Sequence, residues 1–111
     1  MNQVPDKGDI VILHFNPQLG HEQAGTRPCL IISPLNFNKA TGLAFVCPIT
    51  NQQKGYPFEV NITGTTKTTG VILSDQLKSL DWHARKAKVV DKVDKKCIEQ
   101  VEELVKTILF S

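Results

Sequence analysis

Residues 9–33 read DIVILHFNPQLGHEQAGTRPCLIIS, two short apolar runs joined by a long polar connection. Short runs rich in Val, Ile and Leu and bounded by Gly or Pro are typical of β-strands, so we expect strands at 9–15 and 28–33. The connection between them, 16–27, holds twelve residues, most of them polar or small. Loops of this length in a small domain commonly carry function. We therefore expect functional residues in or beside this connection.

Further apolar runs follow at 43–49, 58–62, 71–73 and 84–90, and turn-rich segments separate them at 34–42, 50–57 and 63–70. In the last segment, apolar residues recur at three- and four-residue steps from Val93 to Leu109, with Asp94 available as the N-cap. This spacing predicts one amphipathic helix. Several strands followed by a single helix predict a mainly β or α+β fold, built as a small, curved antiparallel sheet or partly open barrel.

The length of 111 residues and the 41% hydrophobic content fit a single domain spanning 1–111. Thirteen basic and eleven acidic residues give a net charge of +2, which argues against an acidic tail and against a strongly basic nucleic-acid binder. Residues 78–96 differ, because seven basic residues face three acidic ones there. That local excess fits a solvated lysine-rich sheet edge and a phosphate-facing surface equally well.

The first nine residues are polar, and the apolar run Ile10–Leu13 is too short for a signal peptide or a membrane span. We therefore expect a cytoplasmic protein with no membrane partner. Cys29, Cys47 and Cys97 are odd in number, widely spaced and without a CxxC motif, which indicates buried apolar thiols. The motifs GxxxxGK[ST], GxGxxG, HExxH and GxSxG are absent from the sequence, and we predict no metal and no cofactor.

Polar residues lie where the predicted strands meet loops, and these are Glu22, Arg27, Thr50 and Lys54. Arg27 precedes Pro28, which favours an extended backbone for Arg27. Its guanidinium fits either an ion pair with Glu22 or Glu59 or a clamp for a phosphate group. Thr50 is otherwise a β-favoured residue at a strand end, and Glu22 and Lys54 are solvated by default.

Four segments strongly resemble the MazF/PemK (Kid) family of toxin endoribonucleases, and MazF most closely. They are VPDKGDIV (4–11), HEQAGTRPCLIISP (21–34), CPITNQQKGYPFEV (47–60) and GVILSDQLKSLDWHARKA (70–87). Together they cover about half the chain, in the family's order and spacing. Members of this family are the mRNA interferases of type II toxin-antitoxin systems.

The resemblance implies an SH3-like barrel of the CcdB/PemK type with a C-terminal helix, assembled as a homodimer. It implies metal-independent, sequence-specific cleavage of single-stranded mRNA by the RNA's own 2′-hydroxyl, leaving a 2′,3′-cyclic phosphate and a 5′-hydroxyl. Such cleavage inhibits translation and growth. A cognate antitoxin with a disordered acidic C-terminal segment is the implied protein partner, and a short ACA-containing site is the implied RNA target.

The family's catalytic Arg falls on Arg27, its catalytic Thr on Thr50, its loop Glu on Glu22 and its RNA-binding loop Lys on Lys54. A guanidinium and a hydroxyl stabilise the charge that builds on the phosphoryl oxygens during in-line attack. We assign the charge clamp and a proton relay to Arg27, the hydroxyl donor to Thr50, and the orientation of Arg27 or a base to Glu22. The general base stays open, because the pKa of Arg lies above about 12.

His14 is a candidate for that base, because an imidazole beside a 2′-hydroxyl can accept its proton. His21 and His83 have no partner in the sequence that indicates a catalytic role. The remaining candidates for RNA binding are Phe15, Asn16, Gln76, Lys78, Arg85 and Tyr56. Phe15 and Tyr56 fit core or turn packing equally well.

Two other functions remain open at this point. A gyrase-binding toxin of the CcdB kind would share the fold and cleave nothing, although its C-terminus carries a Trp-Gly-Ile-type ending, whereas this chain ends in LVKTILFS. A non-catalytic β-barrel that binds RNA would also fit, because a fold does not determine a function.

Overall fold

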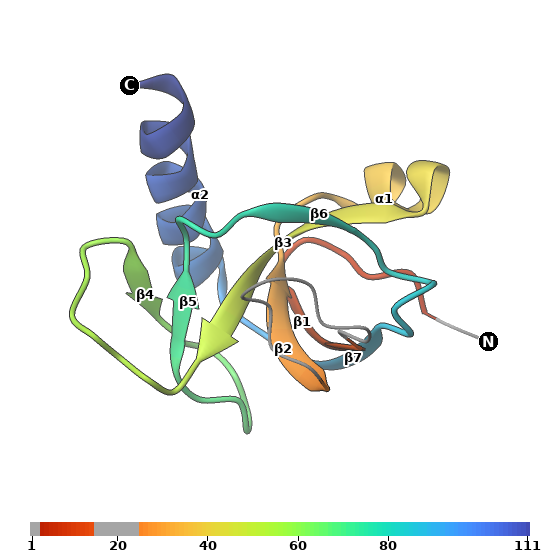
Figure 1. Ribbon diagram of the computed structural model, residues 1–111, viewed down its shortest axis with the longest axis horizontal. Coiled ribbons are helices and arrows are strands. Elements are labelled where there is room, and N and C mark those ends of the chain that lie inside the picture. The colour runs from red at the N-terminus through yellow and green to blue at the C-terminus, as the bar shows by residue number, and fades with distance from the viewer. Residues whose placement is uncertain (1–2, 15–24) are drawn as a thin grey trace.

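The computed structural model describes residues 3–14 and 25–111, which form one antiparallel sheet of seven strands and two helices. In chain order the elements are β1 (Asp9–His14), β2 (Thr26–Ile31), α1 (Leu35–Thr41), β3 (Leu43–Thr50), β4 (Glu59–Asn61), β5 (Val71–Leu73), β6 (Lys78–Asp81), β7 (Lys88–Lys92) and α2 (Lys95–Phe110). Figure 1 shows α2 and α1 on opposite sides of the molecule. The predicted mainly β or α+β fold with a C-terminal helix is confirmed.

Strand β3 is the centre of the sheet. The strand order is β4-β5-β3-β2-β1-β7, and β6 also pairs with β3. One edge of β3 pairs with β2, while the other edge pairs first with β6, over residues 43–46, and then with β5, over residues 49–50. The strand therefore pairs directly with β2, β5 and β6, whereas β1 and β4 are one strand further away and β7 is two strands further away.

Both faces of the sheet are buried. One face packs against α2 and contributes Ile10, Leu30, Cys47, Ile49, Val60 and Ile72 to a cluster with the buried face of the helix. The other face contributes Val11, Leu13, Cys29, Ile31, Val46 and Leu80 to a second cluster, which Trp82 and Ala87 complete. Burial on both sides explains why these strands are near-continuous apolar runs and do not alternate with polar residues.

The C-terminal helix begins as the sequence predicts. The Asp94 carboxylate accepts the Cys97 backbone N–H at 2.9 Å, so Asp94 is the N-cap. Ile98 and Val101 are buried on the face toward the sheet, whereas Phe110 at the end of the helix is 80% exposed. Among the described residues, neither helix is both long and apolar enough to cross a membrane.

The prediction of buried thiols is confirmed, because Cys29, Cys47 and Cys97 are all free and buried. Burial raises the pKa of Cys29 and of Cys47 to about 12 and also raises the pKa of Cys97. These thiols are therefore protonated at neutral pH and pack as small apolar side chains.

The prediction that 34–42 is only a turn-rich segment is wrong, because α1 lies within it. The helix has no apolar period that reveals it in sequence, and contacts with distant residues hold it in place. The Asp6 carboxylate accepts the Leu35 backbone N–H at 2.9 Å at the start of the helix. Asn38, a residue of this helix, is fully buried.

The predicted strand at 84–90 is also wrong in its first half. Residues 82–87 form a turn, in which the Asp81 carboxylate accepts the Ala84 N–H at 2.8 Å and Lys86 has a φ of 54°. The strand at this place, β7, begins only at Lys88. Strand β6, which no apolar run in the sequence indicates, exists because it pairs with β3.

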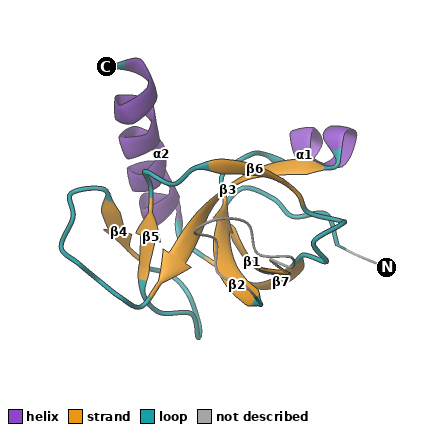
Figure 2. Cartoon of the chain, in the orientation of Figure 1, coloured by secondary structure: helices purple, strands orange, loops and turns teal. Residues whose placement is uncertain are grey.

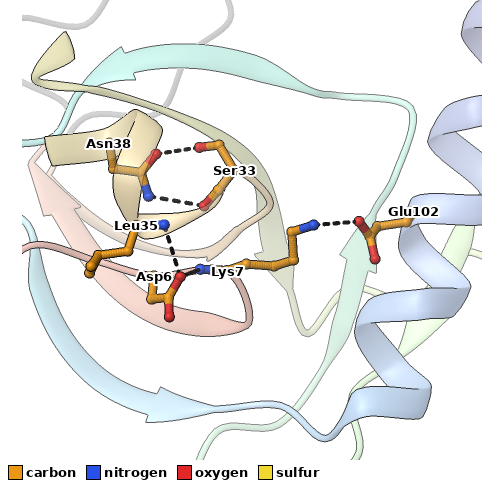
Figure 3. Close-up of polar contacts among 6 residues, drawn as sticks. All are labelled: Asp6, Lys7, Ser33, Leu35, Asn38 and Glu102. Carbon is orange, nitrogen blue, oxygen red and sulfur yellow. Dashed lines mark hydrogen bonds and ion pairs between the residues drawn. The ribbon is translucent and has the colours of Figure 1, made fainter. Parts of the chain in front are cut away.

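Asn38 joins its own helix to Pro5, Ser33 and Trp82 through hydrogen bonds. Its side-chain Nδ2 donates to the carbonyls of Pro5 at 2.8 Å and Ser33 at 3.0 Å, and its Oδ1 accepts the Ser33 hydroxyl (Figure 3). Its backbone carbonyl accepts the Trp82 indole N–H at 2.9 Å. Every polar atom of this buried amide therefore has a partner, as burial requires.

We expect Asn38→Ala to lower the free energy of unfolding by about 2–4 kcal/mol, because it leaves buried partners unpaired and opens a cavity. Asn36→Ala is the matched control on the exposed side of the same helix, and it should stay within about 0.5 kcal/mol of the wild type. Urea denaturation measures both values. Equal stabilities for the two variants would contradict the role given to Asn38.

Candidate active site

Arg27 and Thr50 come together on one face of the sheet. Strands β2 and β3 are antiparallel, and their register pairs Cys29 with Pro48. The paired residues of β2 and β3 end there, and Arg27 and Thr50 each lie two residues beyond this pair in their own strand. Because side chains two residues apart in a strand point to the same face, both side chains lie on the face of Cys29. The two residues that the family resemblance names thus lie on the same face of two neighbouring strands, although 23 positions separate them in the sequence.

Lys78 lies on the same face. It pairs with Val46, which lies four residues before Thr50 in β3 and therefore points to the same side. Burial dominates at Cys29 and raises its pKa, while the positive charges of Lys78 and Arg27 act in the opposite direction. Both cations are therefore close enough to this thiol to affect its ionisation. Two cations therefore lie near a buried, protonated cysteine, on the face that also carries Thr50.

The Thr50 hydroxyl is oriented by the chain that follows it. Thr50 is half-buried at the last position of β3, and its Oγ1 accepts the Gln52 backbone N–H at 3.1 Å. A hydroxyl has one proton to donate and two lone pairs. Because one lone pair of Thr50 Oγ1 already accepts the Gln52 N–H, the hydroxyl proton points away from Gln52 and can be donated to an incoming oxygen.

Residues 51–58, the loop after Thr50, are all exposed, and a carboxylate shapes this loop. Glu59 accepts the backbone N–H groups of Lys54 at 3.0 Å and Gly55 at 2.9 Å. Among the described residues, Glu59 forms no ion pair with Arg27, which was one of the alternatives that the sequence left open. Tyr56 is 59% exposed, which excludes core packing for its ring.

The structure does not bring His14 to this face. In the β1–β2 register Leu13 pairs with Arg27, and His14 pairs with Thr26, so the His14 side chain points to the opposite face. His14 is instead joined to Arg85, whose Nη1 donates to the His14 carbonyl at 3.2 Å and whose carbonyl accepts the His14 N–H at 3.0 Å.

Gln76 is exposed in the connection between β5 and β6, where its N–H donates to the Leu73 carbonyl at 3.1 Å. Glu22, Phe15, Asn16 and His21 lie outside the described residues. The roles of all the site residues remain predictions, and the geometry decides only which of them lie together.

Sequence reasoning did not single out Gly70, which contacts the backbone of Thr50. Gly70 has a φ of 116°, and a Cβ built on it would lie 2.5 Å from the Thr50 carbonyl oxygen. Its position between a Thr-rich loop and the start of β5 is the available sequence signal, because a glycine at a strand end often marks a close backbone approach.

The fold and this face define a small, curved β-sheet protein with a cationic surface suited to an anionic substrate. The model of the PemK-like, MazF-like toxins of type II toxin-antitoxin systems matches residues 6–109, and the chain belongs to this family. The family predicted from the four sequence segments is thereby confirmed.

Two curated relatives come from Escherichia coli. The endoribonuclease toxin MazF of strain K12 is 49% identical over 84 residues, which are 76% of this chain and 75% of the relative. The endoribonuclease PemK is 37% identical over 108 residues, which are 94% of this chain and 81% of the relative. The predicted endoribonuclease class agrees with both names.

Solved structures from Deinococcus radiodurans have the same fold. A crystal structure of MazF matches with a TM-score of 0.90 and 41% identity, covering 99% of this chain and all of that chain. A crystal structure of MazE–MazF matches with a TM-score of 0.87 and 36% identity, covering 98% of both chains.

We expect Gly70→Ala to lower the free energy of unfolding by more than about 3 kcal/mol, because the new Cβ meets the Thr50 carbonyl and the φ is strained. Gly42→Ala is the matched control, since Gly42 also has a positive φ, 73°, but open space around its Cβ. That control should lose only about 1–2 kcal/mol. A smaller loss for Gly70→Ala than for Gly42→Ala in urea denaturation would refute the close approach.

Proposed function

We propose that this chain is the toxin of a type II toxin-antitoxin pair and an endoribonuclease that cleaves single-stranded mRNA on the face of Arg27 and Thr50. The observation that supports this proposal is that Arg27, Thr50 and Lys78 lie on one face of neighbouring strands, in a chain whose relatives are named endoribonucleases. We place this activity in the cytoplasm, where it inhibits translation and growth.

The proposed reaction is a transfer within the RNA and needs no metal ion. The 2′-oxygen attacks the adjacent phosphorus, the bond from phosphorus to the 5′-oxygen breaks, and the products are a 2′,3′-cyclic phosphate and a 5′-hydroxyl. A base takes the proton of the 2′-hydroxyl, and the departing 5′-oxygen receives a proton. Negative charge builds on the nonbridging oxygens, where Arg27 and Thr50 donate hydrogen bonds and Lys78 adds positive charge.

The proton transfers fall to different groups in this scheme. Arg27 is a poor base because a guanidinium stays protonated in proteins, so its main role is the charge clamp, and any relay through it acts as an acid. Glu22 orients Arg27 or the base. A direct role for His14 as the base requires its ring to reach the face opposite to the one it occupies, and this weighs against it.

Single-stranded RNA is the substrate that the chemistry favours. Its unstacked bases can reach exposed side chains, whereas the deep, narrow major groove of an RNA duplex cannot be read by them. Lys54 and Tyr56 on the exposed loop after Thr50 are proposed to contact RNA, as are Gln76 and Arg85. Phe15 and Asn16 complete the proposed contacts, and a short ACA-containing site is the proposed target.

Two protein partners belong to the proposal. A second copy of the chain would cover apolar side chains that one copy leaves exposed, among them Leu35, Leu43 and Phe45, each more than a third exposed. An antitoxin with a disordered acidic segment would fold onto the cationic face and block RNA. The MazE–MazF complexes of the D. radiodurans relatives support this second partner.

We expect Arg27→Ala and Thr50→Ala each to lower kcat for cleavage of a single-stranded RNA by on the order of 10²–10³, because each removes a donor to the developing charge. Lys106→Ala, on the exposed side of α2, is the control and should cleave like the wild type. Single-turnover kinetics measure the rates, and sequencing of 5′-hydroxyl ends identifies the target site. Near wild-type cleavage by both site variants would rule out this face.

The same purified wild-type protein distinguishes the other two functions. Inhibition of gyrase supercoiling without new RNA ends would favour a CcdB-like toxin. RNA binding without new ends and without an effect on gyrase would leave a non-catalytic binding module. New 5′-hydroxyl ends that disappear with Arg27→Ala are the outcome that we expect.

A further inference from the structure

Residues 63–69, here called the threonine loop, connect β4 to β5 (Figure 2). Thr65 and Thr68 are half-buried, the other residues of the loop are exposed, and the loop contributes no side chain to either apolar core. Hydrophobic packing therefore does not hold this loop in place. Its polar contacts must set its conformation.

Asp91 of β7 supplies most of these contacts. Its carboxylate accepts three successive backbone N–H groups, from Thr66 at 3.0 Å, Lys67 at 3.0 Å and Thr68 at 2.9 Å. These amides, with Thr66 contributing most, hold the pKa of Asp91 well below its usual range. The carboxylate is thus ionised at neutral pH and fastens the middle of the loop to β7.

The end of the threonine loop contacts the proposed active site. The Thr69 hydroxyl donates to Asn51 Oδ1 at 3.1 Å, directly beyond Thr50. Gly70 follows and packs against the Thr50 carbonyl, and Val71 pairs with Thr50 in the sheet. A continuous segment of five residues, 66–70, therefore runs from the Asp91 carboxylate to the backbone of Thr50 and Asn51.

We propose that Asp91 is a positioning residue for RNA cleavage, which acts through the threonine loop to fix Thr50 and Asn51. This inference rests on the proposed function, because it assigns Thr50 the donor role. Asp91 does not contact the reacting atoms. Asp91 fixes the threonine loop, and the threonine loop fixes the C-terminal end of β3. This end of β3 carries the Thr50 hydroxyl.

The expected effect is on kcat more than on KM. A donor that acts in the transition state loses efficiency when it is displaced by a fraction of an ångström, and a displacement of about 1 Å can cost 10²-fold in rate. RNA binding depends on many contacts elsewhere, so it changes little. A general loss of folded protein would also lower the apparent kcat at an unchanged KM, so each kcat is divided by the folded fraction of that variant.

Two variants test the path at its two ends. Asp91→Asn keeps the size of the side chain but replaces one acceptor oxygen by an NH₂ group that faces N–H groups. Thr69→Val removes only the hydroxyl that reaches Asn51. We expect each variant to lower kcat about tenfold with KM within about twofold of the wild type. Because both act through one path, the double variant should lose little more than the worse single variant.

Asp6→Asn is the matched control. Asp6 also uses its carboxylate to accept two backbone N–H groups, from Lys7 at 2.7 Å and Leu35 at 2.9 Å, but beside α1. Its loss should leave kcat unchanged. A wild-type kcat for Asp91→Asn, equal losses for Asp91→Asn and Asp6→Asn, or additive losses in the double variant would overturn the inference.

A second measurement does not depend on RNA cleavage. The Gln52 N–H donates to Thr50 Oγ1, so its hydrogen exchange reports whether Thr50 is held. We expect Asp91→Asn and Thr69→Val to speed exchange at Gln52 several-fold and Asp6→Asn to leave it unchanged. Unchanged exchange at Gln52 in Asp91→Asn refutes the inference even if the wild type cleaves RNA. If the two variants exchange faster than the wild type but the wild type cleaves no RNA, the positioning is supported and only the proposed function is refuted.

Discussion

The structure depends on the pairing of β3 along both edges, and the two faces of this strand belong to two apolar clusters. One edge meets a single partner, β2, while the other edge is divided between β6 and β5. The change of partner occurs near the end of the strand, where Thr50 stands. Thr50 pairs there with Val71 of β5 and is only half-buried, which suits a group that must be rigid and accessible.

Carboxylates fix the conformation of the loops around the sheet. Glu59 accepts amides of the loop after Thr50, Asp91 accepts amides of the threonine loop, and Asp94 caps α2 and accepts the Thr63 hydroxyl. Carboxylate hydrogen bonds to backbone amides are stronger than neutral ones. The acidic residues of 78–96 therefore serve the backbone.

The candidate site was accessible to sequence reasoning only in part. The resemblance to the family identified Arg27 and Thr50 as candidate catalytic residues. Pro28 indicated that the backbone of Arg27 is extended. Their juxtaposition followed from the register of β2 and β3, which no local pattern specifies. The same register moves His14 to the other face, because one position along a strand reverses the direction of a side chain.

The sequence by itself determined the elements whose formation is local. The apolar period from Val93 and the N-cap at Asp94 specify α2, and the apolar runs specify β1, β2, β3 and β5. Only the tertiary structure decided α1 and β6, because a buried Asn38 and the edge of β3 supply the hydrogen bonds that their own residues do not. The gathering of Arg27, Thr50 and Lys78 was decided in the same way, since strand pairing brings together residues far apart in the chain.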